Sequence, residues 1–225
     1  QLDRHAAELA AGHGMEVWVQ PILVSGSMDD TRAQFVEAAT RLETVRNTGV
    51  STTLVTGATL TVLMEGILDG SSYDARIESL YDAYDNDSLE DVAQRLDDFL
   101  ASTVEAVRAV YGGSLTYNAG SWEWPYLDWS RFDFLSASHY RDEDNASVYE
   151  EEIAQMKLLG KPVVISEFGS ATFEGAGDLG VLGTDIIDWD VEPPEVAGPY
   201  VRSESEQADT ILELLDIFEE QQLAG

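Results

Sequence analysis

The chain has no cysteine, and only two of its 225 residues are lysine, Lys157 and Lys161. The lack of cysteine excludes disulfide bonds, cysteine nucleophiles and thiolate metal ligands. No run of about 18 apolar residues occurs, so we expect no membrane-spanning helix. The three histidines, His5, His13 and His139, stand apart without H-x-H or H-E-x-x-H spacing. We therefore expect no metal site.

Several binding and catalytic motifs are also missing. No G-x-G-x-x-G follows the first predicted strand, where a dinucleotide-binding turn would stand, because the one match, 175–180, comes after the last predicted strand. The phosphate-binding motif G-x-x-x-x-G-K is absent. It also lacks the G-x-S-x-G turn that presents a serine nucleophile in one large class of hydrolases. We expect no nucleotide or other cofactor, and no Ser-His-Asp triad.

Negative charge is abundant instead. Asp and Glu number 43 against 12 Lys and Arg, which gives a net charge of −31, while 44% of the residues are hydrophobic. This composition predicts a packed core under an acidic surface, as in proteins adapted to high salt. We expect the cytoplasm of a salt-accumulating halophile, or secretion into high salt. The same charge argues against nucleic acid or an anionic membrane as a partner. The oligomeric state stays open.

Segments with strand and helix patterns alternate along the chain. Strands are predicted over 15–24, 51–56, 115–118, 132–138 and 163–167. Helices are predicted over 2–11, from Asp29 or Asp30 to 46, over 89–111 after Ser88, over 146–159, and from Ser203 to 222. The alternation predicts a parallel α/β sheet in one domain spanning 1–225. Functional residues at several strand ends favour a (β/α)8 TIM barrel, incomplete because only five strands are evident.

The segment 161–169 has the clearest functional pattern. Pro162 opens an apolar run, Glu167 stands where the run ends, and Gly169 breaks the strand. In a parallel barrel the chemistry lies at the C-terminal ends of the strands. Glu167 is therefore a candidate nucleophile or general base, and the alternative is a solvated acid at a strand end.

Two other strand ends carry functional groups. Asn118 precedes Trp122, Glu123 and Trp124, and a later strand ends at His139, Tyr140 and Arg141. Glycoside hydrolysis needs two carboxylates that flank the glycosidic bond. Glu123 and Glu167 are candidates for this pair, because both are carboxylates at or just after strand ends. The aromatic side chains would bind sugar rings. The alternatives are a loop acid for Glu123 and a core residue for His139.

The segment 115–215 resembles a family of TIM-barrel proteins known as abortive-infection proteins, which in turn resemble clan A glycoside hydrolases. The motifs that carry the resemblance are Trp122-Glu123, Asp128-Trp129, Phe132-Asp133, Tyr140-Arg141, 162–169, Gly175-Ala176, Asp178, 200–202 and Gln207-Ala208. The resemblance implies that Glu167 takes the place of the clan nucleophile after the seventh strand. Tyr140 then follows the sixth strand, where the clan often has a partner of the nucleophile.

By the same resemblance the clan's acid would fall at Thr59, which is not a carboxylate. Glu123 is then the expected substitute. Barrel strands 1, 2 and 8 are not evident in the sequence. These features lead to two hypotheses: a glycosidase-like hydrolase acting on an unknown glycan or glycoside, or a sugar-binding barrel that has lost hydrolysis with the strand-4 acid. The glycine-containing loop over 170–202 is expected to cover part of the cleft.

Overall fold

The computed structural model describes residues 6, 9–10 and 12–225. The predicted helix over 2–11 falls mostly outside these described residues. The chain forms two compact units, which divide between Ala137 and Ser138.

The five predicted strands form one sheet in the order β1-β2-β3-β4-β5. β1 pairs with β2, β2 with β3, and β3 with β4, and each of these pairs is parallel. The strands are β1 (Val17–Val19), β2 (Thr52–Ala58), β3 (Ser114–Ala119), β4 (Leu135–Ser138) and β5 (Val163–Glu167). The strand predicted over 15–24 is thus reduced to three residues. Every residue of β2 is buried, as expected for a strand covered on both faces.

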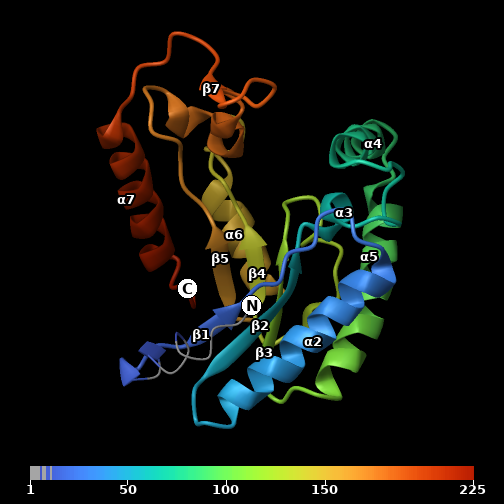
Figure 1. Ribbon diagram of the computed structural model, residues 1–225. Helices are drawn as coiled ribbons and strands as arrows, with labels where there is room; N and C mark the ends of the chain where they lie inside the picture. The colour runs from blue at the N-terminus through green and yellow to red at the C-terminus, as the bar shows by residue number, and fades with distance from the viewer. Residues whose placement is uncertain (1–5, 7–8, 11) are drawn as a thin grey trace. The chain divides into compact units, whose positions relative to one another are not determined.

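In the first unit, the long helices α2 (Met28–Arg46) and α5 (Leu89–Arg108) lie side by side (Figure 1). Five apolar side chains of these helices and of β2 are at most 1% exposed: Phe35 and Leu42 of α2, Leu54 of β2, and Leu96 and Leu100 of α5. Burial of each such side chain contributes roughly 1.5–3 kcal/mol. This apolar layer fixes the helices against the sheet, so that the strand ends are held rigidly.

Two helix starts differ from the predictions. Ser27, and not Asp29 or Asp30, caps α2, because its side-chain oxygen accepts a hydrogen bond from the Asp30 N–H. Ser88 precedes α5 as predicted but makes no side-chain capping bond. Two helices were not predicted, α3 (Leu60–Leu63) and α4 (Tyr73–Asp85).

The chain turns sharply where β2 ends. Gly57 has φ +103°, and a Cβ atom there would lie 2.8 Å from the Leu60 side chain. Thr59 has φ 38° and ψ 47°, a left-handed conformation that is rare for a β-branched residue. Its N–H donates to the Asn118 carbonyl at 3.0 Å. Thr59 is thus one of the strained non-glycine positions of the first unit, with Ser25 and Asp87, and it is the position where the resemblance would put the clan's acid.

The second unit contains α6 (Tyr149–Leu158), β5 and α7 (Glu204–Glu220). Ser203 caps α7 as predicted, accepting a hydrogen bond from the Glu206 N–H. The long loop after β5 has its own structure, with the short turns η2 (Ala176–Asp178) and η3 (Gly180–Thr184) and the antiparallel pair β6 (Ile187–Asp188) and β7 (Glu195–Val196). At the chain's last two residues, Ala224 N–H donates to Val163 O and Gly225 O accepts from Ile165 N–H. These residues therefore lie against β5.

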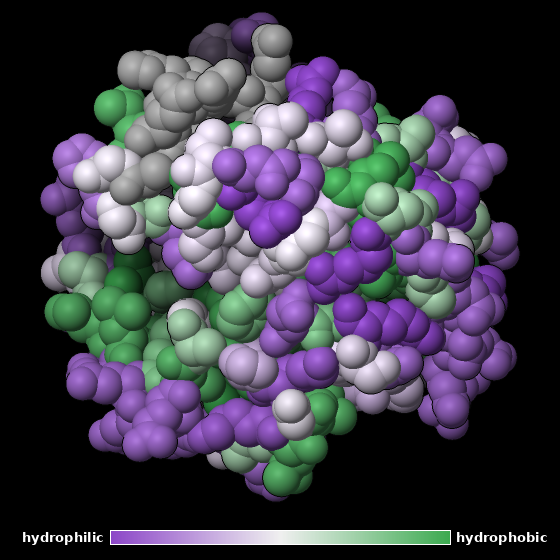
Figure 2. Space-filling view, turned by 90° about the horizontal axis from the view of Figure 1, so that it is seen from below, coloured by the Kyte–Doolittle hydropathy of each residue, from purple (hydrophilic) through white to green (hydrophobic). Residues whose placement is uncertain are grey.

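Hydrophilic side chains cover much of the face shown in Figure 2, with apolar groups between them. Among the described residues, no helix is both long and apolar enough to cross a membrane.

Candidate functional site

Glu167 is the last residue of β5 and is half-buried. Its Oε2 accepts a hydrogen bond from Ser138 Oγ at 2.7 Å. Its backbone oxygen accepts a second bond, at 2.9 Å, from the N–H of His139. The end of β4 therefore fixes both the backbone and the side chain of Glu167, while part of the residue stays open to solvent.

Tyr140 and Arg141 follow β4 in the same unit, and both are half-buried. Burial raises the pKa of the Tyr140 phenol, and the charge of Glu167 raises it further. Tyr140 is therefore a neutral phenol close enough to Glu167 to be influenced by its charge. Arg141 lies 3.5 Å from Glu213 of α7, so its charge is partly balanced by that helix.

His139 is only 2% exposed, and its ring stacks on Tyr149 with centroids 4.2 Å apart. Burial lowers the pKa of His139 from 6.5 to about 4. The ring is therefore neutral at pH 7, and the 3.5 Å approach of its Nε2 to Glu152 is not an ion pair there. His139 contributes to the site through its backbone, because its N–H binds Glu167 and its carbonyl accepts the Tyr149 hydroxyl at 2.8 Å.

Glu123 lies in the first unit and is 0% exposed. Its Oε1 accepts from the N–H and the hydroxyl of Thr61 at 3.2 and 2.7 Å. Its Oε2 accepts from the Tyr117 hydroxyl at 3.0 Å and from the Gly120 N–H at 2.9 Å. Burial raises the pKa of Glu123, and these four donors act in the opposite direction. In this conformation Glu123 joins the loops after β2 and β3 and does not touch solvent.

The other predicted site residues of the first unit are mostly buried. Asn118 is 0% exposed and Trp124 is 7% exposed. Trp122 is half-buried, and its indole N–H donates to Thr61 Oγ1 at 2.8 Å. Trp122 is therefore the one predicted side chain of this group with an open surface for a ligand.

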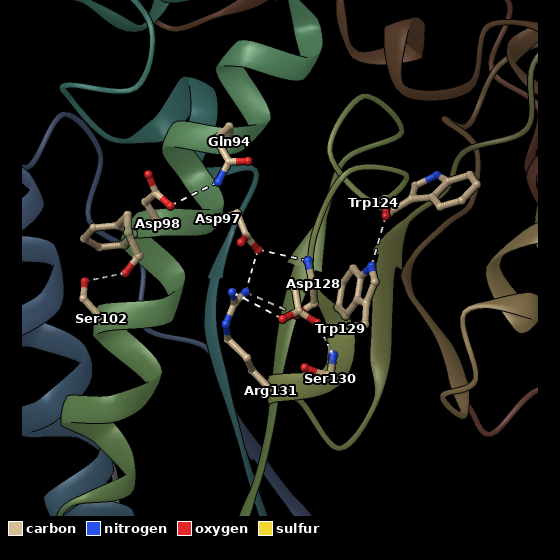
Figure 3. Close-up of polar contacts among 10 residues, drawn as sticks. Gln94, Asp97, Asp98, Ser102, Trp124, Asp128, Trp129, Ser130 and Arg131 are labelled. Atoms are coloured by element: carbon tan, nitrogen blue, oxygen red, sulfur yellow. Dashed lines mark hydrogen bonds and ion pairs between the residues drawn. The ribbon is translucent and has the colours of Figure 1, made fainter.

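A polar cluster holds the loop that carries Trp124 (Figure 3). Asp97 of α5 accepts hydrogen bonds from Arg131 at 2.6 Å and from the Asp128 N–H at 2.9 Å. The neighbouring Trp129 donates its indole N–H to the Trp124 carbonyl at 3.0 Å. The Asp128-Trp129 motif thus has a structural role, since it fixes the loop on α5.

The predicted residues fall into two groups, one in each unit. Glu167, His139, Tyr140 and Arg141 come together in the second unit, whereas Asn118, Trp122, Glu123 and Trp124 belong to the first. Sequence reasoning missed the partners of the carboxylates, which are Ser138, Thr61 and Tyr117. Ser138 could have been proposed as a site residue from the sequence, because it ends a predicted strand next to His139. No group of three or more potential metal ligands is found within the part of the chain that the structure describes.

No family model matches the chain, and no curated protein matches its sequence. Two solved structures of a GH113 beta-1,4-mannanase, one of them a complex, match it in fold with a TM-score of 0.64. Their sequence identity to this chain is 15%, and each match covers 96% of the chain. The chain spans 63% of the length of these proteins.

At this identity the likeness concerns the fold alone. Together with the five strands and the helices between them, it confirms the predicted α/β fold, an incomplete TIM barrel.

Proposed function

We propose that this protein is a glycoside hydrolase that acts on a glycan or glycoside through Glu167 as the nucleophile. One observation carries the proposal: a half-exposed carboxylate ends β5, and the neighbouring strand holds it in place through Ser138 and the His139 backbone. The fold supports it, because barrel enzymes place their chemistry at the C-terminal ends of strands.

The neighbours of Glu167 suit a nucleophile. The Ser138 hydroxyl donates a hydrogen bond to Oε2 at 2.7 Å and holds the carboxylate in place. That bond also orients the carboxylate of Glu167, which is the group proposed to attack the anomeric carbon. Tyr140, whose pKa is raised, stays protonated at neutral pH and can donate a hydrogen bond to the carboxylate or to the substrate.

The proton for the leaving group is the difficult step. Thr59 stands where the acid would be expected, and Glu123 has no exposed surface from which to reach a glycosidic oxygen. We therefore propose that Glu123 positions the loops after β2 and β3, and that substrates with good leaving groups react best. An aryl glycoside needs little proton donation, because a phenol has a pKa near 10, far below that of the aliphatic alcohol that leaves from an ordinary glycoside.

The test compares the wild type with Glu167→Gln on a panel of aryl glycosides. The amide keeps the shape of the side chain but cannot attack an anomeric carbon, so turnover should be abolished. Glu174→Gln is the matched control, because Glu174 is an exposed acid in the loop after the same strand. Activity that survives in Glu167→Gln would remove the nucleophile assignment. If the wild type bound sugars without any turnover, the protein would be a sugar-binding barrel and not a hydrolase.

A further inference from the structure

A pocket of about 360 Å³ lies within the second unit, in the loop that follows β5. Its lining residues are Ala171, Thr172, Phe173, Gly183, Thr184, Ile186, Ile187, Val196, Tyr200 and Arg202. The loop thus forms an open pocket of its own, with a volume within the range usual for small-molecule sites.

The lining is mainly hydrocarbon. Phe173 and Tyr200 form an aromatic wall, with ring centroids 4.9 Å apart in an edge-to-face arrangement. Two polar side chains at the lining already have partners, since Thr184 Oγ1 donates to Val181 O and Arg202 pairs with Glu204. A sugar ring would lose hydrogen bonds with water in such a lining, whereas an apolar ring would not.

The pocket also lies close to Glu167 along the chain. Ala171, at one wall, is four residues beyond Glu167, and an extended residue spans at most about 3.6 Å. The two Cα atoms are therefore no more than roughly 14 Å apart, a distance that a glycoside with a bulky aglycone can bridge.

We infer that this pocket binds the aryl aglycone of a glycoside whose sugar lies at Glu167. The inference rests on the proposed function and narrows it to aryl glycosides. An apolar cavity of about 150 Å³ holds benzene, so a volume of about 360 Å³ accommodates a two-ring aryl group. The acidic composition favours an uncharged occupant, because a net charge of −31 repels anions.

The chemistry of an aryl substrate fits the surroundings of Glu167. Glu167 attacks the anomeric carbon, a new C–O ester bond forms, and the bond to the phenolic oxygen breaks with its electron pair leaving as phenolate. Water then hydrolyses the ester, which gives the free sugar and regenerates the Glu167 carboxylate. The proton released by that water balances the phenolate, so no acid at Thr59 is required.

Binding is tested first, with 2-naphthol as the probe and titration calorimetry as the readout. Val196→Asp places a charge in the apolar lining at a residue that is 54% exposed, so the fold should tolerate it. Val201→Asp is the matched control, since Val201 is 57% exposed in the same loop and is not a lining residue. Tyr200→Ala removes the aromatic wall as a second variant. We expect Val196→Asp and Tyr200→Ala to weaken naphthol binding about tenfold or more, and Val201→Asp to leave it unchanged.

No naphthol binding by the wild type, or equal binding by all variants, would overturn the inference. A hydrolysis assay tests the proposed function separately from the aglycone site. Aryl glycoside turnover that Val196→Asp leaves unaltered would refute the aglycone site but keep Glu167 as nucleophile. Selective naphthol binding without any turnover would support the aryl site and refute the hydrolase.

Discussion

Replacing His139 with phenylalanine should flatten the dependence of stability on pH. The pKa of His139 is 6.5 in an unfolded chain and about 4 in the folded protein, because burial disfavours the charged ring. Above pH 6.5 the ring is neutral in both states. Between pH 6.5 and 4 only the unfolded chain binds the proton, so the free energy of unfolding falls as the pH falls. Below pH 4 both states are protonated, and the loss ends.

The size of this effect follows from the same values. One pKa unit corresponds to about 1.4 kcal/mol, so His139 should remove up to about 3 kcal/mol of stability between pH 6.5 and 4. Phenylalanine keeps a flat ring for the stack on Tyr149 and does not titrate. It also removes the ring nitrogen Nε2, which is buried without a hydrogen-bond partner.

The assay is urea unfolding at a series of pH values in high salt, which screens the net charge. The difference between the wild type and His139→Phe should grow in favour of the variant as the pH falls from 6.5 to 4. His13→Gln is the control, because His13 is exposed. The neighbouring acids Glu152 and Asp142 are present in both proteins, so their contributions largely cancel in the difference. Parallel pH profiles for the wild type and His139→Phe would refute the reasoning.

Two further predictions concern the buried acid and the surface charge. Glu123→Gln should lower the free energy of unfolding by roughly 2 kcal/mol or more, because one amide nitrogen would face donors that now bind the carboxylate. Turnover of aryl glycosides per folded molecule should change little. Denaturant unfolding and turnover assays on the wild type and Glu123→Gln measure the two quantities, and the exposed Glu105→Gln is the control. A loss of turnover without a loss of stability would restore Glu123 as the acid. The melting temperature should rise from dilute to molar salt, since the Debye length shrinks from about 10 Å at 0.1 M to about 3 Å at 1 M. A flat response in thermal melts would contradict the proposed adaptation to high salt.

The locations of the strands along the chain and the place of Glu167 at a strand end could be predicted because they depend on local pattern. The apolar run before Glu167 and the glycine after it mark a buried strand and its end. Ser203 was identified as a cap because serine is a preferred N-cap residue and it directly precedes a helical pattern. These signals need no knowledge of distant residues.

Helix α4 was not predicted, because its local apolar pattern is weak. Its buried residues are Arg76, Leu80 and Ala83, and Tyr81 and Tyr84 are exposed. The apolar period is therefore weak, because Arg76 is buried through hydrogen bonds to Val62 O and Ser25 Oγ. A charged residue in a core position interrupts the apolar periodicity by which a helix is predicted from the sequence.

The burial of Glu123 could not be predicted either, because it depends on a residue that is distant in the sequence. Its sequence neighbours, Trp122 and Trp124, suggested an aromatic ligand platform. Its burial depends on Thr61, which lies 62 residues away. Only the pairing of β2 with β3 brings the two together, and no local pattern carries that information.

The Glu123 network also has a consequence for the order of folding events. The Thr61–Glu123 bond closes a loop of 62 residues, and ordering such a loop costs entropy before its contacts form. The carboxylate must lose its water in that step, and it does so more easily when protonated. Docking of the strand-end loops should therefore be a late event whose rate increases as the pH falls towards the pKa of Glu123. In Glu123→Gln that acceleration should disappear.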